Sequence, residues 1–249
     1  MMFDRYKKLS PFFSYFGGKW RAAYLYPLPR HRRIVEPFAG SAGYALRYAM
    51  LDVELYDVDP VICGVWDYLI NVSAREILAL PDLQAGQDVR DLCLPDEAKH
   101  LIGFWLNKGT TRPGQTMSAW ARSGKYAGSV WGARVRQTIA TQLHAIRHWT
   151  IRQQCYSSIE NSSATWFVDP PYEDKGRAYR CNAIDYEALA AWCKTRNGLA
   201  IVCEQKGASW LPFDRLASCK TTRSNRSNEV IWIKDSRDQI STVSDFACS

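Results

Sequence analysis

The stretch RIVEPFAGSAGYALRYAMLDVELYDVDP, residues 33–60, indicates the fold of the chain. Residues 33–35 predict a short strand that enters a turn containing Gly40 and Gly43. Residues 44–50 predict a helix, and residues 53–56 predict a second strand. Asp59 is expected to cap a further helix, because Pro60 follows it at the first helical position. This order of elements predicts a strand–helix–strand unit.

The same alternation continues along the rest of the chain. Further helices are predicted at 60–69, 72–80, 95–106, 130–149 and 185–198, and further strands at 166–168, 199–202 and 230–233. The stretch 108–128 contains five glycines or prolines and predicts a loop. Strands that alternate with helices at this spacing predict an α/β fold with a doubly wound sheet covered on both faces.

The composition is that of a soluble globular protein. The chain has 249 residues, of which 47% are apolar and 23% are charged. We expect no membrane contact, because no apolar stretch approaches membrane-spanning length and the first residues lack the apolar core of a secretion signal. Eight cysteines occur without a CxxC pair. This pattern predicts reduced thiols in the cytoplasm, and neither a metal site nor a disulfide framework.

The net charge of +7 is unevenly distributed along the chain. No acidic residue lies between Glu97 and Glu160, while the same window holds nine basic residues: Lys99, Lys108, Arg112, Arg122, Lys125, Arg134, Arg136, Arg147 and Arg152. Tryptophans and a tyrosine are interleaved with them. Basic residues that follow phosphates and aromatic residues that stack are typical of nucleic-acid contact. The alternative is a solvated basic face, although such faces normally mix both signs of charge.

Two motifs after the first two strands predict a ligand site. Glycines between a strand and a helix, here Gly40 and Gly43, allow the backbone to approach a ligand closely. A plain tight turn would explain them equally well. An acid at the end of the next strand is where nucleoside-binding folds hydrogen-bond ribose hydroxyls. We expect Asp57 to be that acid, since Asp59 is needed as a helix cap.

A third motif, DPPY at residues 169–172, follows the predicted strand at 166–168. Pro170 holds both itself and Asp169 in rigid conformations. Neither proline has an N–H, so the Asp169 carboxylate and the Pro170 carbonyl are two fixed acceptors that can bind both hydrogens of an amino group. An exocyclic nucleobase amine bound in this way becomes a better nucleophile. Tyr172 is then expected to stack on the extruded base.

These motifs, taken together and in this order, resemble those of the Dam-type family of DNA adenine-N6 methyltransferases. The resemblance includes YFGGKW at residues 15–20, EPFAG at 36–40, Asp57 and DPPY. It implies a Rossmann-like methyltransferase sheet, S-adenosylmethionine as the cofactor and double-stranded DNA as the partner. It also implies that the cofactor is held by Tyr15, Lys19, Glu36, Phe38, Gly40, Asp57 and Asp169. The family usually has Gly-x-Gly in the second motif, whereas this chain has Ala42 and then Gly43.

The resemblance also implies a division of the chain into two regions. Residues 1–80 and 155–249 would form the catalytic domain, and residues 81–154 an inserted, mainly helical DNA-recognition region. Within it, Arg112, Arg122 and Lys125 lie in the predicted loop and are expected to contact base edges. Arg134 and Arg136 lie on the predicted helix and are expected to contact phosphates or to pair with the scaffold.

Three functions are consistent with these observations. The first is adenine-N6 methylation, with Asp169, Pro170 and Tyr172 as the catalytic residues. The second is methylation of cytosine N4 or of RNA, because the clamp requires only an exocyclic amine. The third is a DNA-binding protein without activity, although binding alone does not require an amine clamp. The recognised DNA sequence and the oligomeric state stay open.

Overall fold

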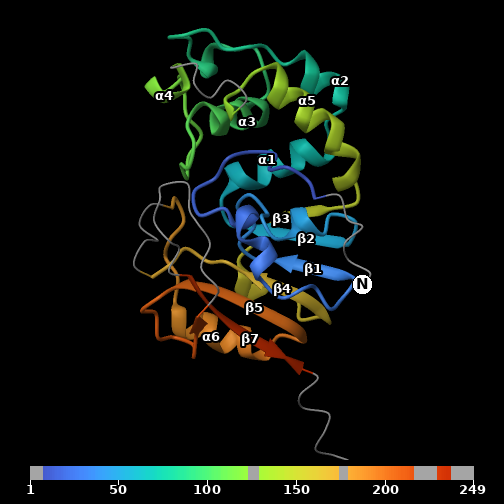
Figure 1. Cartoon of the computed structure of the whole chain (residues 1–249), viewed down its shortest axis with the longest axis vertical. Coiled ribbons are helices and arrows are strands. Elements are labelled where there is room, and N and C mark those ends of the chain that lie inside the picture. The colour runs from blue at the N-terminus through green and yellow to red at the C-terminus, as the bar shows by residue number, and fades with distance from the viewer. Residues whose placement is uncertain (1–7, 123–128, 174–178, 216–228, 237–249) are drawn as a thin grey trace, which may run out of the picture.

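A computed structural model gives the fold for residues 8–122, 129–173, 179–215 and 229–236 (Figure 1). The chain forms a mixed α/β structure around a seven-stranded sheet in the order β3-β2-β1-β4-β5-β7-β6. The strands are β1 (Arg33–Glu36), β2 (Asp52–Asp57), β3 (Thr150–Gln153), β4 (Ala164–Val168), β5 (Gly198–Gln205), β6 (Asp214–Arg215) and β7 (Glu229–Asp235). Among the described residues, no helix combines the length and hydropathy that a membrane span requires.

The sheet is mostly parallel. In the run β3-β2-β1-β4-β5, each strand is parallel to the next one. β7 is antiparallel to both of its neighbours, β5 and β6. β4 and β5 carry nearly continuous apolar runs, ATWFV and GLAIV, because each is buried on both faces. The chain order reverses between β1 and β4, which are neighbours, and ligands of open α/β sheets bind at such a reversal. The architecture is compatible with the predicted Rossmann-like fold.

Alternate strand residues face two separate hydrophobic clusters. Ile34, Leu55 and Phe167 belong to the larger cluster, which continues into the helices above the sheet. Val35 and Trp166 belong to the smaller one, which α6 (Tyr186–Thr195) covers with its apolar side. The prediction of a sheet buried on both faces is therefore confirmed, since one period-two pattern supplies both clusters.

Several helices begin where the sequence predicts. Asp59 accepts a hydrogen bond from Val61 N and caps α1 (Pro60–Asn71), and Asp185 caps α6 in the same way. Ser73 and Glu76 form a capping box that starts α2 (Ala74–Ala79). The remaining helices are α3 (Asp96–Leu106), α4 (Ala119–Arg122) and α5 (Ala133–Gln142). Single 3₁₀ turns are η1 (Lys19–Arg21), η2 (Ala23–Leu25), η3 (Ala45–Arg47), η4 (Val89–Asp91), η6 (Leu143–Ile146) and η7 (Tyr156–Ser158).

The predicted helix at 44–50 is wrong, because this stretch forms only the short turn η3. Tyr44, Leu46 and Tyr48 are all buried, and Tyr44 stacks on Phe167 with ring centroids 4.4 Å apart. Within this stretch only Arg47 and Met50 are not buried, and such packing overrides helix propensity. The predicted helix at 130–149 is also too long: it ends at Gln142 and gives way to η6 and then to β3.

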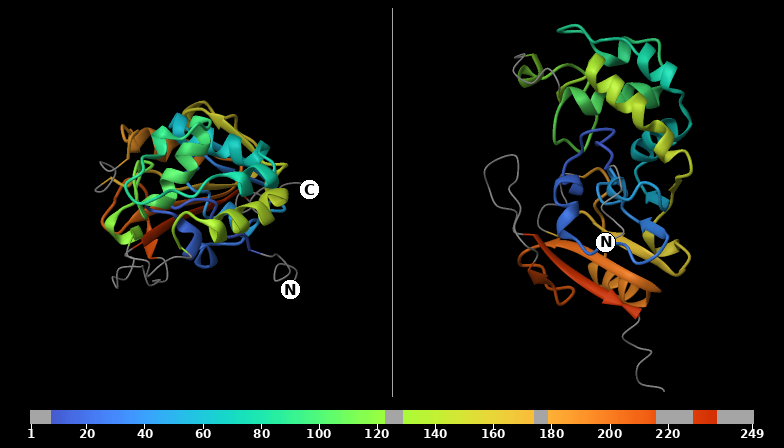
Figure 2. Two further views of the ribbon diagram at one scale, coloured as in Figure 1. Left: turned by 90° about the horizontal axis from the view of Figure 1, so that it is seen from above. Right: turned by 45° about the vertical axis from the view of Figure 1, so that its right-hand side comes forward.

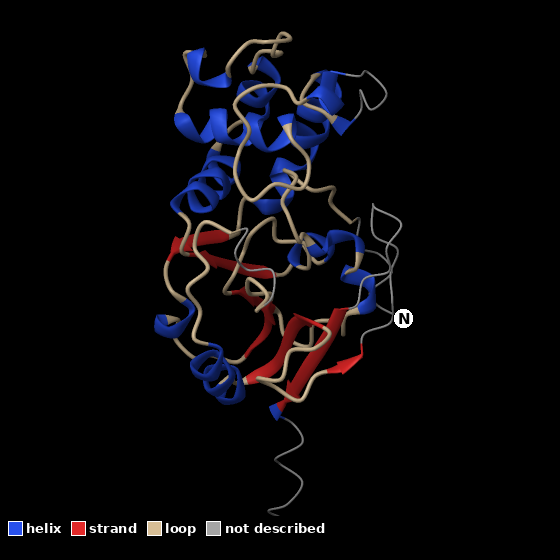
Figure 3. Ribbon diagram, turned by 90° about the vertical axis from the view of Figure 1, so that its left-hand side faces the viewer, coloured by secondary structure: helices blue, strands red, loops and turns tan. Residues whose placement is uncertain are grey.

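The helices α2 to α5 gather in a lobe beyond the β3 edge of the sheet (Figures 1 and 2). Figure 3 shows the same separation by colour, with this helical lobe above the strands. The predicted insertion of residues 81–154 contains most of the lobe but differs from it at both ends. α2, from the predicted catalytic segment, packs against α5, and β3, from the predicted insertion, pairs with β2. β3 is an exposed edge strand of sequence TIRQ, which lacks the apolar run that would reveal it.

Candidate functional site

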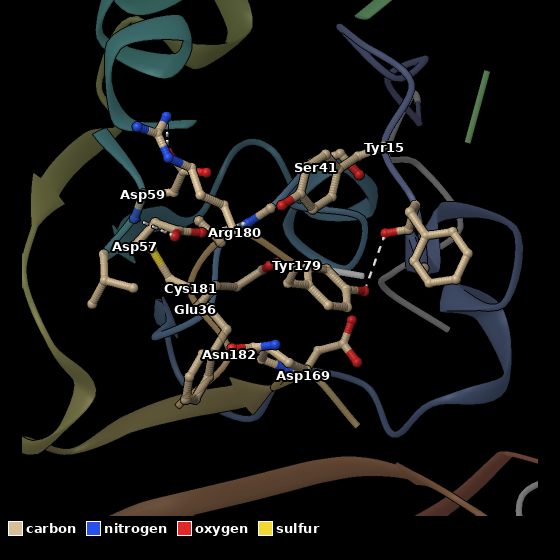
Figure 4. Close-up of a pocket in the computed structure, with 18 of the residues that line it drawn as sticks. Tyr15, Glu36, Ser41, Asp57, Asp59, Asp169, Tyr179, Arg180, Cys181 and Asn182 are labelled. Atoms are coloured by element: carbon tan, nitrogen blue, oxygen red, sulfur yellow. Dashed lines mark hydrogen bonds and ion pairs between the residues drawn. The ribbon is translucent and has the colours of Figure 1, made fainter. Parts of the chain in front are cut away.

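A pocket of about 280 Å³ lies at the carboxyl ends of β1, β2 and β4. Glu36 is the last residue of β1, Asp57 is the last residue of β2, and Asp169 directly follows β4 (Figure 4). All seven predicted cofactor residues line this pocket: Tyr15, Lys19, Glu36, Phe38, Gly40, Asp57 and Asp169. Residues far apart in the sequence meet here because parallel strands end at the same edge of the sheet.

The glycine turn fits tightly against the N-terminal segment. Gly40 has a φ of +44°, and a Cβ there would lie 3.2 Å from the Tyr15 ring. Ala42 also has a positive φ, +50°, so alanine occupies a conformation that glycine usually provides. A Cβ at Gly43 would lie 2.5 Å from Trp20 N, so this glycine allows the Lys19–Trp20 backbone to pack on the turn. Packing alone thus explains Gly43, although this residue also lines the pocket.

Glu36 is a buried acid whose carboxylate faces both the turn and the pocket. Its Oε1 accepts a hydrogen bond of 2.7 Å from Ala45 N, and the residue is only 2% exposed. Burial raises the pKa of Glu36 to about 8, which the hydrogen bond from Ala45 N only partly offsets. At neutral pH, Glu36 therefore holds a proton unless a cation approaches it.

Asp57 and Asp59 have different structural roles, as the sequence predicts. Asp57 accepts hydrogen bonds from Gly40 N at 3.1 Å and from Asp59 N at 3.0 Å, so it joins the glycine turn to the end of β2. Burial raises the pKa of Asp57 to about 6 against the effect of these bonds. Asp59 caps α1, and its Oδ1 lies 3.8 Å from Arg180 Nη1. Each Asp57 oxygen keeps a lone pair for a further donor.

Asp169 lies against a buried lysine. Lys19 Nζ is 2.8 Å from Asp169 Oδ1, an ionic contact that lacks the alignment of a hydrogen bond. Burial raises the pKa of Asp169 to about 6, and the nearby Lys19 ammonium opposes this rise. Burial would lower the pKa of Lys19, but the carboxylates of Asp169 and Glu229 outweigh it and raise that pKa. The sequence predicts Lys19 as a cofactor contact, and the structure makes it the counter-ion of Asp169 as well.

The other two predicted catalytic residues, Pro170 and Tyr172, do not line the pocket, although Pro171 does. The Tyr172 hydroxyl donates a 2.6 Å hydrogen bond to Glu229 Oε1, and Lys19 Nζ lies 4.9 Å from the centre of its ring. The aromatic ring beside Asp169 within the pocket is Tyr179 (Figure 4). A base stacked on Tyr172 would therefore need a surface outside this pocket.

The stretch 179–184, which the sequence analysis did not place, also lines the pocket. The Tyr179 ring centroid lies 6.1 Å from that of Tyr15 and 5.9 Å from that of Phe16, and the Tyr179 hydroxyl donates to Phe16 O at 3.4 Å. Tyr179 has no motif signal because its position depends on how the chain returns after DPPY. Residues 174–178, between Glu173 and Tyr179, lie outside the described residues.

The predicted DNA-binding residues divide into two groups. Arg112, Arg122 and Arg134 are exposed, whereas Lys125 lies outside the described residues. Arg136 is buried: its Nη1 donates to Asp82 Oδ1 at 2.5 Å, and its guanidinium lies over the Trp131 ring. Of the two roles predicted for Arg136, this geometry favours pairing with the scaffold over contact with phosphates.

Two other basic residues of the acid-free window also bond to the scaffold. Arg147 donates to the carbonyls of Ile70 and Val72, and Arg152 donates to the Tyr56 hydroxyl. The sequence does not show which basic residues bond to the scaffold, because their acceptors are distant in the chain.

The loop that carries Arg112 is bonded to the pocket wall. Phe16 N donates to Thr110 O at 3.1 Å, and Gly109 N donates to Ser14 Oγ at 3.2 Å. On α3, Trp105 Nε1 donates to Phe12 O at 2.9 Å. The segment 12–16 thus contacts the helical lobe on one side, while Tyr15 lines the pocket on the other. This connection places the basic loop next to the segment that carries Tyr15 and Phe16.

No protein-family model matches the chain, and a search of curated protein sequences finds no match.

We expect Glu36→Gln to change how stability depends on pH. In the folded protein the pKa of Glu36 is about 8, above the value of about 4.3 for an exposed glutamate. The contribution of Glu36 to the free energy of unfolding is therefore complete below the pKa of an exposed glutamate. It is lost as pH rises through 8, by up to about 1.4 kcal/mol per pH unit. Glutamine still accepts from Ala45 N but does not titrate. Melting temperatures from pH 5 to 8.5 should fall less in the variant.

Glu187→Gln, an exposed acid-to-amide change on α6, is the matched control and should follow the native curve. Raised pKa values are also found for Asp57, Asp169 and Glu204. These acids lower stability with rising pH in the native protein and in both variants alike. Parallel curves for native protein and Glu36→Gln would contradict the assignment of the buried proton to Glu36.

Proposed function

We propose that the protein is a DNA adenine-N6 methyltransferase that uses S-adenosylmethionine. The observation that carries the proposal is that one pocket brings together Glu36, Asp57 and Asp169 at the ends of three strands, although they come from separate motifs. The sequence predicts the roles of Asp57 and Asp169 from their places after strands, and the family resemblance implies that of Glu36. A chance arrangement of turns and caps would not need to place all three in one cavity.

The charge of the pocket supports a cationic ligand. Among the described residues, four acidic side chains line it, those of Glu36, Asp57, Asp59 and Asp169, against the two basic side chains of Lys19 and Arg180. S-adenosylmethionine carries a sulfonium and an ammonium, and a nearby positive charge lowers the pKa of a buried acid. The raised pKa values of Glu36 and Asp57 are what a pocket for such a ligand has before the ligand enters.

The proposed binding mode assigns one task to each part of the pocket. The Asp57 carboxylate accepts hydrogen bonds from the ribose hydroxyls, and the turn at Gly40 gives the nucleoside access to the backbone. Glu36, buried beside the turn, faces the ammonium of the methionine part. Tyr15 packs on Gly40 and closes the pocket on the side of the helical lobe. The bound cofactor supplies an electrophilic methyl group.

The proposed chemistry rests on Asp169 and the Pro170 carbonyl. Both would accept hydrogens of the adenine N6 amine and make its nitrogen a better nucleophile, and the bound cofactor would supply the methyl group that this nitrogen takes up. The amine then carries a positive charge and releases one proton, for which the Asp169 carboxylate is the nearest acceptor in this arrangement. Asp169 must be ionised for this task, and the adjacent Lys19 ammonium favours the ionised form.

The test is methyl transfer from S-adenosylmethionine with a labelled methyl group to duplex DNA and to RNA, followed by digestion to nucleosides. The proposal expects label in N6-methyldeoxyadenosine. Label in N4-methylcytosine or in RNA nucleosides would instead assign the same clamp to another substrate. Absence of both transfer and cofactor binding by calorimetry would contradict the proposal and leave a DNA-binding protein without activity.

A further prediction concerns the exposed basic residues. Alanine at Arg112, Arg122 or Arg134 should weaken duplex binding, and each lost phosphate contact should lower the salt slope by about one. A residue that contacts a base edge should instead cost about 1–3 kcal/mol at the target sequence only. Affinities on cognate and scrambled duplexes at two salt concentrations separate these cases.

Arg32→Ala is the matched control. It removes an equal charge next to the amino end of β1, whereas the pocket lies at the carboxyl end of that strand. Arg136→Ala should lower the melting temperature and leave the salt slope unchanged, since its guanidinium pairs with Asp82. Equal losses in the control and in the three exposed positions would show that only net charge matters.

A further inference from the structure

A buried cluster of charged and polar groups lies directly behind the proposed clamp. Lys19 Nζ is 2.8 Å from Asp169 Oδ1 and 3.4 Å from Glu229 Oε1, and it donates to Gly17 O at 2.8 Å. Tyr172 donates to the same Glu229 oxygen at 2.6 Å. Glu229 therefore contacts both the lysine that pairs with Asp169 and the tyrosine that ends the DPPY motif, although none of the sequence motifs includes it.

The sheet topology explains how Glu229 reaches this position. It is the first residue of β7 and is paired with Gln205, the last residue of β5. Because β7 is antiparallel, its first residue lies at the same edge of the sheet as the carboxyl ends of the parallel strands. A parallel strand in this place would present its last residue there instead.

The acidic and thiol groups of this cluster are spaced as in a metal-ion site, but the positive charge among them is that of Lys19. Ligand atoms of Asp169, Cys203 and Glu229 all lie within 4.8 Å of one another. The Lys19 ammonium lies between two of these acids. An ammonium at that position provides the positive charge that two buried carboxylates require. The arrangement is a lysine shared by two acids, of which only Asp169 lines the pocket.

We propose that Glu229 is a positioning residue of the amine clamp: it holds Lys19 and Tyr172 against Asp169 and thereby sets the position and charge of that carboxylate. The inference rests on the proposed function for its catalytic consequence, while the network itself rests on the contacts alone. Glu229 does not touch the substrate. It acts through Lys19, which it shares with Asp169, and through Tyr172, which it anchors at the hydroxyl.

The titratable groups around Asp169 come from every adjacent element. They are Lys19 from η1, Glu36 from β1, Cys203 and Glu204 from β5, Glu229 from β7, and the hydroxyls of Tyr26, Tyr172 and Tyr179. Glu229 raises the pKa of Asp169, whereas Lys19 lowers it. Removing the charge of Glu229 leaves Lys19 to Asp169 alone, so both effects shift the pKa of Asp169 downward.

Two substitutions separate charge from anchoring. Glu229→Gln removes the charge but keeps an oxygen that can accept from the Tyr172 hydroxyl. Glu229→Ala removes both. Asp235→Asn is the matched control, because Asp235 lies at the other end of β7, is an equally buried acid at 10% side-chain exposure, and forms an ion pair with Arg30.

The first readout does not depend on activity. Protein labelled with ¹³C at aspartate carboxyl carbons is titrated by NMR, and the Asp169 signal is assigned by its loss in Asp169→Asn. We expect the Asp169 titration to move down by about one pH unit in Glu229→Gln and to stay unchanged in Asp235→Asn. An unchanged titration in Glu229→Gln would overturn the inference, whether or not the protein transfers methyl groups.

The second readout is the pH profile of methyl transfer. Glu229→Ala should lower kcat at least tenfold while the dissociation constant for S-adenosylmethionine stays within about threefold. Glu229→Gln should recover kcat to within about threefold at pH 8 and should move the acidic limb of its profile to lower pH. A native kcat in Glu229→Ala, or a native acidic limb in Glu229→Gln, would overturn the inference. A shifted titration without any methyl transfer would contradict the proposed function alone.

Discussion

Replacing Asp169 with alanine should abolish methyl transfer and leave S-adenosylmethionine binding within about tenfold of the native value. The carboxylate is expected to act on the base amine, so its loss removes an interaction of the reacting group and not of the bound cofactor. Asp169→Asn should be less severe, because its carbonyl can still accept one hydrogen bond. Single-turnover transfer assays measure the rate, and calorimetry measures the binding.

The structure adds a second effect that the assay must separate. Lys19 loses its closest counter-ion in Asp169→Ala and keeps only Glu229 at 3.4 Å, so some loss of stability is expected in that variant. Asp169→Asn also removes this counter-ion but keeps the shape of the side chain, so it is the control for this loss. Melting temperatures of both variants should therefore be compared before their rates are. Substantial turnover by Asp169→Ala on any DNA would rule out the amine clamp.

The second large effect is expected at Asp57. Asp57→Ala should weaken S-adenosylmethionine binding by roughly 1.5–3 kcal/mol, the contribution of hydrogen bonds to a charged group. Some stability should be lost as well, because Gly40 N and Asp59 N lose their acceptor. The side chain of Asp57 is a better acceptor when it is ionised. The affinity of the native protein for S-adenosylmethionine should therefore also fall as pH drops through about 6, the pKa of Asp57.

Asp59→Ala is the matched control two residues further along the chain. It removes the cap of α1 and should cost about 1 kcal/mol of folding stability with little effect on cofactor affinity. Calorimetry at a temperature where both variants are folded separates the two roles. The reverse pattern, with affinity lost mainly in Asp59→Ala, would transfer the ribose role to Asp59.

The parts of this fold that follow from sequence are those with local causes. The buried strands β4 and β5 consist of apolar runs, and the start of α1 follows from Asp59 and Pro60. Asp57 and Asp169 were predictable because the first ends a strand and the second directly follows one, whereas Glu36 was predicted only through the family resemblance. Local signals of this kind do not depend on how distant segments pack.

The rest depends on contacts between distant parts of the chain. β3 is polar, and only its pairing with β2 defines it as a strand. The role of Glu229 follows from the register of the antiparallel β7, and that of Tyr179 from the return of the chain to Phe16. Arg136 and Arg134 are two residues apart, yet only one is buried against Asp82. No local pattern distinguishes such residues.

The segment 12–16 contacts both the pocket and the loop that carries Arg112, and this sharing has a thermodynamic consequence. On one side Tyr15 packs against Gly40 in the pocket, and on the other Phe16 N is bonded to Thr110 in the loop that carries Arg112. A ligand in the pocket and a ligand on the loop would therefore lie against two sides of the same segment. If one of them changes the affinity for the other, the reverse change must have the same size, since coupling free energies are reciprocal. The strength of that coupling can be measured from either side.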